Sequence, residues 1–154
     1  MAFDEERGVK EGDSEKEFIK YLYPMIDKLA WIEIKNNAIL STRSRGKTAW
    51  YIPGGKREQG ETDQQALIRE IDEELTVSLI ENSLTFFGEF SAQAHGHPEG
   101  VRVRMRCYTG VYFGEIKAAA EIEEVGWLKY SDRYKISPVD QIIFDYLFEK
   151  GMIA

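Results

Sequence analysis

Cysteine is nearly absent from this sequence of 154 residues. Its one cysteine, Cys107, excludes a disulfide within the chain and favours a reducing compartment. Long hydrophobic runs are also missing, since no apolar segment approaches the roughly 20 residues that a membrane-spanning helix needs. The first residues, MAFDEERGVKEGDSEKEF, are polar and lack the apolar stretch of a secretory signal peptide. We therefore expect a cytoplasmic protein without a membrane span.

Basic residues are outnumbered by acidic ones, 20 against 27, which gives a formal net charge of −7. A surface of this sign repels the phosphates of nucleic acid and of anionic membranes, so we expect neither as a stable partner. With 43% hydrophobic and 12% aromatic residues, the composition is that of a folded protein rather than a disordered one. The length fits one domain, and a homodimer stays an open alternative on base rate alone.

The pattern of apolar and turn-forming residues predicts both strands and helices. A hairpin is expected around Asn36-Asn37, and Pro53 should end a short strand. Helical periodicity follows the capping box Ser14–Glu17 and returns near the C-terminus. The predicted strands cover 30–34, 38–42, 49–52, 84–94, 101–113 and 122–130, and the C-terminal helix covers 140–150.

Strands and helices do not alternate regularly along the chain, which favours an α+β domain with a mixed sheet between helices. The sequence contains no internal repeat and no low-complexity linker. We divide it into an N-terminal extension with a short helix, residues 1–27, and a domain of residues 28–154.

A central helix is predicted over residues 63–75. Thr62 is a good N-cap, and Gln65 three residues later completes a capping box. A buried stripe at spacing i+4 is formed by Leu67, Ile71 and Leu75.

The same helix carries an acidic face. Glu70, Glu73 and Glu74 stand at i, i+3 and i+4, so the three like charges lie close together and repel one another. Taken alone, such a face could be a solvated helix surface. Carboxylate oxygens are also hard ligands, and the natural partner of a cluster like this is Mg²⁺ or Mn²⁺. The preceding glycines Gly54 and Gly55 let backbone approach a ligand closely.

A segment without acids lies just before this helix. Residues 43–57 contain no aspartate or glutamate but five bases, Arg43, Arg45, Lys47, Lys56 and Arg57. These bases could be solvated, or they could neutralise the charge of a phosphate-bearing substrate that the metal also binds. The combination favours metal-assisted attack of water on phosphorus.

Two other polar clusters leave alternatives open. Arg102, Arg104 and Arg106 alternate with apolar residues on a predicted strand and either face water or contact substrate. His95 and His97 lie in a Gly/Pro-containing loop, which fits a surface loop better than a zinc site because no cysteine accompanies them.

Residues 55–77, GKREQGETDQQALIREIDEELTV, resemble the Nudix box, G-x5-E-x7-R-E-U-x-E-E-x-G-U, in which U is a bulky aliphatic residue. Eight of the nine specified positions match, and the departure is Thr76 in place of glycine. That glycine ends the helix in a left-handed conformation, where threonine is unfavourable by about 1 kcal/mol or more. Thr76 therefore affects the turn and removes no charged group.

The resemblance implies an α/β/α sandwich and assigns roles by position. Glu70, Glu73 and Glu74 would bind Mg²⁺, with the Gly54 carbonyl as a further ligand, and either Glu73 or Glu74 would act as the base. Glu121 would match a further metal-linked acid of MutT-like enzymes.

The resemblance also implies supporting and substrate-binding residues. Arg69 would hold the acids in place, and Glu61 would pair with Arg69. Arg43 and Lys56 would contact phosphate, and Asp140 would contact the base of a nucleotide.

The activity implied is Mg²⁺-dependent hydrolysis of a nucleoside diphosphate linked to another moiety. Our first expectation is a nucleoside triphosphate, which would yield a nucleoside monophosphate and pyrophosphate. ADP-ribose and nucleotide sugars are the main alternatives. A nucleotide-sensing module without catalysis is an alternative of another class, although such modules usually lose acids that this chain retains.

Overall fold

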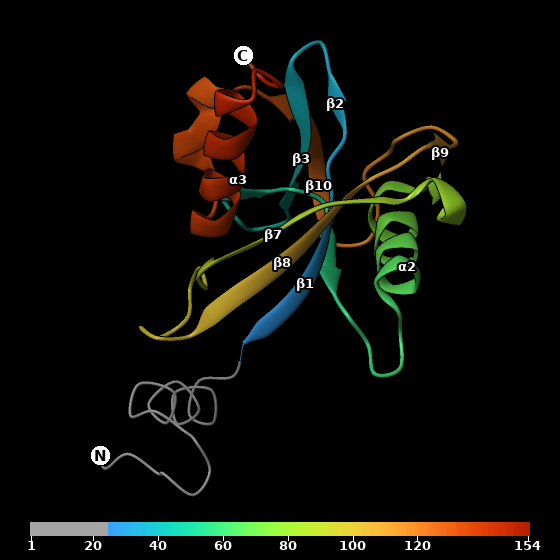
Figure 1. Cartoon of the computed structure of the whole chain (residues 1–154), viewed down its shortest axis with the longest axis horizontal. Helices are drawn as coiled ribbons and strands as arrows, with labels where there is room; N and C mark the ends of the chain where they lie inside the picture. Colours follow the sequence, from blue (N-terminus) through green and yellow to red (C-terminus); the bar gives the residue numbers. More distant parts are fainter. Residues whose placement is uncertain (1–24) are drawn as a thin grey trace, which may run out of the picture.

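The computed structural model of the chain describes residues 25–154 (Figure 1). The helix predicted after Ser14 lies outside these residues. The first described strand, β1, begins at Ile26, and the division into an extension of residues 1–27 and a domain of residues 28–154 stays a prediction. Its strands are β1 (Ile26–Trp31), β2 (Ile34–Lys35), β3 (Ala38–Ser44), β4 (Trp50–Tyr51), β5 (Gly54–Lys56), β6 (Ser78–Leu79), β7 (Thr85–Gln93), β8 (Arg102–Thr109), β9 (Tyr112–Phe113) and β10 (Ile122–Leu128). Its helices are α2 (Asp63–Leu75), η1 (Glu81–Ser83), η2 (Tyr130–Lys135) and α3 (Pro138–Glu149).

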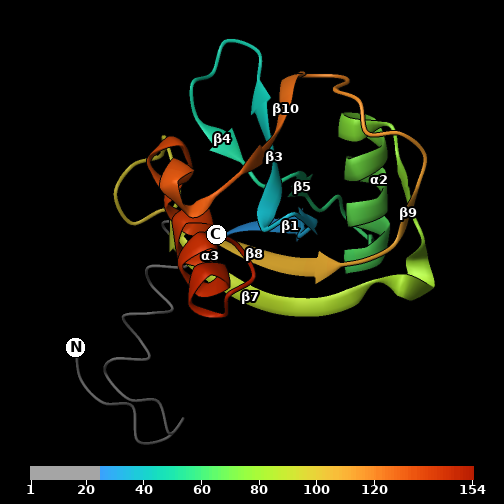
Figure 2. The same cartoon turned by 90° about the horizontal axis from the view of Figure 1, so that it is seen from above.

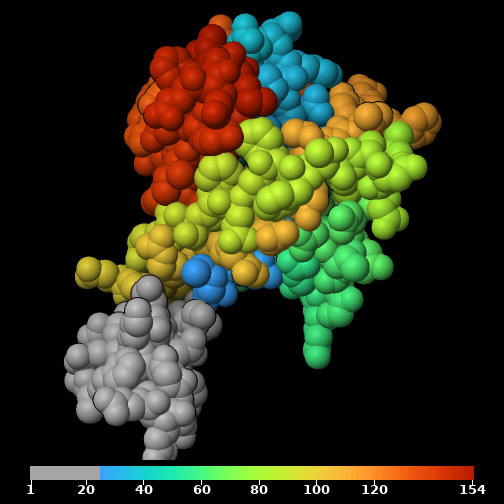
Figure 3. Space-filling view, in the orientation of Figure 1, coloured from blue at the N-terminus to red at the C-terminus, as the bar shows by residue number. Residues whose placement is uncertain are grey.

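The strands form two main sheets with helices on both sides. One sheet has the order β5-β1-β8-β7, in which β1 and β8 are parallel and the other pairs antiparallel. The second has the order β10-β3-β2, with β4 on β3. Figures 1 and 2 show α2 and α3 on opposite sides of these strands, and Figure 3 shows the red C-terminal part and the green α2 separated by β7. The α+β sandwich expected from the sequence is confirmed.

Alternating side chains of β1 build the two cores. Leu29 and Trp31 belong to the cluster that packs on α2, whereas Ala30 and Ile32 belong to the cluster that packs on α3. This is the period of two expected of a strand covered on both faces. Lys28 has the same parity as Ala30, so it points to the α3 side.

The predicted hairpin is confirmed, and two short strands, β5 and β6, were missed. Asn36 and Asn37 have positive φ angles of 51° and 60°, as a tight turn between β2 and β3 requires. Pro53 was expected to end a strand, but the residues directly after it, Gly54–Lys56, form β5, antiparallel to β1. A Cβ at Gly54 would lie 2.0 Å from the Leu29 carbonyl oxygen, so only glycine lets the two strands approach this closely.

The central helix α2 begins and ends where the sequence predicts. Thr62 accepts a hydrogen bond from the Gln65 N–H, and Gln65 accepts one from the Thr62 N–H, which completes the capping box. Thr76 adopts the left-handed conformation, with φ 61° and ψ 24°, that the missing glycine would occupy. Its hydroxyl donates to the Glu115 carbonyl at 3.1 Å.

Replacing Thr76 by glycine is expected to raise the free energy of unfolding by up to about 1 kcal/mol, because the left-handed conformation carries no Cβ penalty in glycine. Loss of the exposed hydrogen bond to Glu115 and the larger entropy of unfolded glycine reduce the gain. Urea unfolding measures the difference. Thr85→Gly is the control, since Thr85 is exposed in β7 without a positive φ and should lose stability. A destabilised Thr76→Gly protein would contradict the prediction.

No helix among residues 25–154 is long and apolar enough to cross a membrane.

Candidate active site

A cavity of about 360 Å³ lies between α2, β5 and the segment that enters β10. Glu70 and Glu74 of α2 line it, together with Glu121, the residue directly before β10. The backbone of Gly54 and Gly55 forms part of the same wall. We call this the acidic cavity.

Glu74 is the most deeply placed of these acids. It is 5% exposed, and its Oε1 accepts a hydrogen bond from the Gly54 N–H at 3.2 Å. Burial, followed by the charges of Glu70 and Glu121, raises the pKa of Glu74 to about 8. A proton, or a cation in its place, therefore stabilises this carboxylate in the folded protein.

Glu70 lies against the backbone of β5. A Cβ at Gly55 would stand 2.4 Å from the Glu70 carboxyl carbon, so the glycine is what lets the carboxylate occupy this position. Burial raises the pKa of Glu70, while the neighbouring Arg69 opposes the rise. The first glycine of the box thus has a packing role that its sequence position alone does not reveal.

Arg69 ties the acids to the loop before the helix. Its Nε and Nη2 donate to the two oxygens of Glu61, each at 2.8 Å, and its Nη1 donates to Glu70 at 2.9 Å. Nη2 also reaches the Lys56 carbonyl at 3.1 Å. The Arg69 guanidinium lowers the pKa of Glu61 to about 2, so this pair stays charged. Arg69 can therefore orient Glu70 and anchor β5 at once.

The three box glutamates do not share one environment. Glu73 lies outside the acidic cavity with a 55% exposed side chain, 3.6 Å from Arg69. Glu121, rather than Glu73, lies beside Glu70 and Glu74, and the charge of Glu121 contributes to the raised pKa of both Glu70 and Glu74. Helical spacing indicated a common face, but of the three glutamates only Glu70 and Glu74, at positions i and i+4, line the cavity.

Hard oxygen donors facing one cavity fit a divalent ion such as Mg²⁺ or Mn²⁺. Residues 25–154 contain no group of three or more histidine, cysteine or acidic side chains that are close enough together to hold a metal ion by themselves. Water or substrate oxygens would then complete the coordination, as is usual for Mg²⁺. The same finding gives no support to a zinc site at His95 and His97.

Two residues expected to contact substrate do not line either of the cavities described here. Arg43 is occupied by Glu124 at 2.6 Å, Glu123 at 3.4 Å and the Lys47 carbonyl at 2.9 Å. Asp140 is fully buried in α3 and accepts a hydrogen bond from the Ile52 N–H at 3.2 Å. Both side chains thus have protein partners in this structure, and their contact with substrate stays a prediction.

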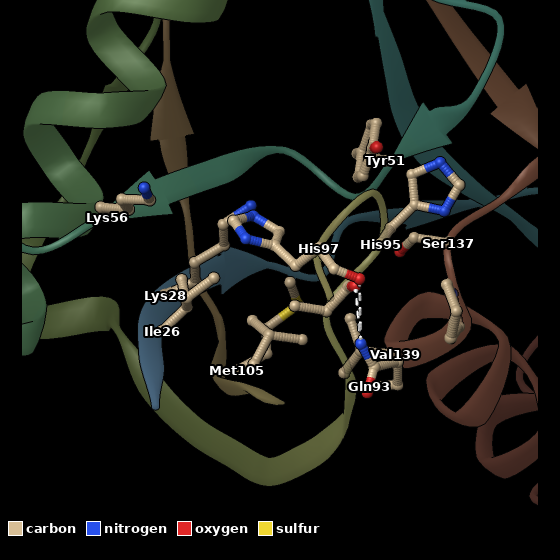
Figure 4. Close-up of a pocket in the computed structure, with 13 residues that line it drawn as sticks. Ile26, Lys28, Tyr51, Lys56, Gln93, His95, His97, Met105, Ser137 and Val139 are labelled. Carbon is tan, nitrogen blue, oxygen red and sulfur yellow. Dashed lines mark hydrogen bonds between the residues drawn. The ribbon is translucent and has the colours of Figure 1, made fainter. Parts of the chain in front are cut away.

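Figure 4 shows a second cavity, of about 160 Å³. The two cavities share four lining residues, Lys28, Tyr51, Lys56 and Met105. Lys56 was expected to contact phosphate, whereas no sequence pattern pointed to Lys28. Ser137 and Val139, at the N-terminus of α3, line the opposite side of the second cavity.

The loop after β7 forms one wall of the second cavity. Gln93 donates from Nε2 to the Pro98 carbonyl at 2.9 Å and accepts from the Gly100 N–H at 3.0 Å, which closes the loop on itself. This holds His95 and His97 at the cavity, and His95 packs edge-on to Tyr51 with ring centroids 6.2 Å apart. Arg104 and Arg106 point elsewhere and form ion pairs with Asp27, Asp63 and Glu89.

The metal-free protein is expected to lose stability as the pH is raised from about 5 to about 8. Because the folded-state pKa of Glu74 is raised from 4.5 to about 8, its contribution is fully present below the lower value and disappears as the pH passes the higher one. Thermal unfolding in the presence of a chelator measures this slope. Glu74→Gln should flatten it, leaving the part due to Asp140, whose burial raises its pKa to about 7. An unchanged slope in the variant would contradict the assignment.

Residues 29–147 match the NUDIX domain family. An ADP-ribose pyrophosphatase of Methanocaldococcus jannaschii is 30% identical over 135 residues, which cover 86% of this chain and 78% of that protein. A bifunctional NMN adenylyltransferase/ADP ribose pyrophosphatase of Francisella tularensis is 25% identical with a TM-score of 0.61, over 90% of this chain and 48% of that one. A MutT NUDIX hydrolase of Burkholderia pseudomallei, 20% identical over 78% of this chain and 95% of its own, has a TM-score of 0.65 and supports the fold.

These matches agree with the spacing of the box and with the acidic cavity that its residues form. The chain belongs to the Nudix family and is a hydrolase of phosphorus-containing acid anhydrides.

Proposed function

We propose that this enzyme is a divalent-metal-dependent pyrophosphohydrolase whose substrate is ADP-ribose or a closely related nucleoside diphosphate sugar. The observation that carries the proposal is the shared wall of the two cavities. A pyrophosphate bound at the acids would place an organic group in the second cavity. The 30% identical relative, named an ADP-ribose pyrophosphatase, supports the same substrate class.

Glu70, Glu74 and Glu121 would hold the metal, with the Gly54 carbonyl as a further ligand. When bound, a divalent ion neutralises phosphate charge and lowers the pKa of a bound water. Glu74 is better placed than Glu73 to accept a proton from the attacking water, because it lies inside the cavity. Arg69 and Glu61 orient Glu70, and Lys56 lies where it could contact phosphate.

A nucleoside triphosphate was our first expectation from the sequence. It relied on the short single domain and on the placement of Arg43, Glu121 and Asp140. Of these three residues, only Glu121 lines one of the two cavities. This finding moves the preference to a substrate with an organic group on each side of the pyrophosphate. A sensing module is disfavoured, since every acid of the box is retained.

A panel of ADP-ribose, nucleotide sugars and nucleoside triphosphates, each with Mg²⁺ or Mn²⁺ and read by product mass, tests the proposal. We expect ADP-ribose to be converted to AMP and ribose 5-phosphate, with one oxygen taken from water. Faster release of a monophosphate and pyrophosphate from a triphosphate would overturn the substrate choice. Binding across the panel without turnover would point to a sensing module.

A further inference from the structure

Two lysines stand side by side on the wall between the cavities. Lys28 of β1 and Lys56 of β5 are register partners in an antiparallel pair, so their side chains leave the sheet on the same face. Both residues line the acidic cavity. They also line the second cavity, where Figure 4 labels them. They are therefore located where the pyrophosphate and the organic part of a substrate would meet.

Like charges directly opposite each other destabilise an antiparallel pair. Among residues 25–154, neither lysine has a carboxylate oxygen within 4.0 Å of its ammonium. Burial lowers the pKa of Lys28, and the Lys56 charge lowers it further, while Asp140 and the cavity glutamates act in the opposite direction. The net effect disfavours the charged form of Lys28 in the free protein, and the Tyr51 ring, whose centroid lies 5.8 Å from the Lys28 Nζ, offsets part of it.

We infer that Lys28 and Lys56 together form a binding site for a phosphoryl group at the junction of the two cavities. The inference rests on the proposed function for the identity of the substrate, and it adds Lys28 as a specificity-determining residue. A phosphate dianion between the two ammonium groups would replace their repulsion with two charge-assisted contacts. Substrates or products without a phosphoryl group at this point would gain nothing from the pair.

The shared ligand chemistry is a phosphate monoester, which either AMP or ribose 5-phosphate could supply. Calorimetric titration with each compound, and with adenosine and ribose, separates the two sources. Lys28→Met should weaken binding of the recognised monophosphate by about 10- to 100-fold and leave the unphosphorylated compound unchanged. Lys28→Arg should retain most of the affinity. Lys117→Met is the matched control, since Lys117 is 65% exposed and pairs only with Glu115 among the described residues.

Thermal unfolding provides a readout that a structural role would not produce. Lys28→Met should raise the Tm of the free protein, because it removes both the repulsion and the burial of a charge, yet reduce the Tm gain produced by the monophosphate. Lys56→Met should also lose monophosphate affinity, and it keeps the test valid if Lys28→Met folds poorly. A lower Tm in Lys28→Met, or unchanged monophosphate affinity in both variants, would overturn the inference.

The outcomes separate this inference from the proposed function. Turnover of ADP-ribose with an unchanged KM and monophosphate affinity in Lys28→Met would leave the function standing and remove the lysine site. If the protein hydrolyses nothing in the panel but binds the monophosphate through the two lysines, the lysine site would stand and the proposed function would fall.

Discussion

Glu74→Gln is expected to lower kcat by roughly 10²- to 10⁴-fold, the range typical of a lost acid–base group. Glutamine keeps the shape of the side chain and its hydrogen bond to the Gly54 N–H, but it cannot accept a proton or supply a negative charge to the metal. Steady-state kinetics with the preferred nucleotide and saturating Mg²⁺ measures the loss. Folding should be retained, because the buried carboxyl already favours its neutral form.

Two acids on the same helix serve as comparisons. Asp72→Asn should leave turnover unchanged, because Asp72 is exposed and lines neither cavity. Glu73→Gln should lower turnover by less than Glu74→Gln, since its side chain lies outside the acidic cavity. Wild-type rates in both glutamate variants would show that the metal assignment is wrong. A larger loss in Glu73→Gln would show that Glu73 enters the site when metal and substrate bind.

Gly54→Ala is expected to lower the free energy of unfolding by about 3 kcal/mol or more. Gly54 has a φ of 147°, and an added Cβ would meet the Leu29 carbonyl oxygen at 2.0 Å and the Ala30 Cα at 2.9 Å. These are backbone atoms of the neighbouring strand, so no side-chain movement relieves the clash. Activity should fall with stability, because β5 carries the N–H that holds Glu74. Chemical denaturation monitored by fluorescence measures the loss.

Gly46→Ala is the matched control for this strand. Gly46 also has a positive φ, 73°, but nothing lies within 4 Å of the position that a Cβ would take. Alanine there should cost only about 1–2 kcal/mol, the penalty of the left-handed conformation itself. Equal losses in the two variants would show that the close approach of β5 to β1 contributes nothing.

Local patterns were sufficient where a few neighbouring residues control the conformation. The capping box at Thr62 and the stripe through Leu67, Ile71 and Leu75 predicted α2 to the residue. The left-handed end of this helix was expected from the place of Thr76 in the box, and the chain adopts that conformation although the residue is not glycine. The Asn36-Asn37 hairpin is a local feature of the same kind.

Patterns failed where distant segments define the environment. A segment of two glycines and a lysine, residues 54–56, does not have the pattern of a strand. It forms β5 because it pairs with the edge of β1. Helical spacing placed Glu70, Glu73 and Glu74 together, but the packing of α2 sends Glu73 outward and brings in Glu121 from the approach to β10. The burial of Asp140 and its hydrogen bond from the Ile52 N–H could not be anticipated from its place before the last helix.

The sequence by itself determined the α+β class, the position of α2 and the acids and arginine of the box, because spacing along one helix and its caps is local information. Only the tertiary structure decided which acids share a cavity, which bases are already paired, and that Lys28 stands opposite Lys56. Those features depend on strand register and on packing between segments that lie far apart in the chain.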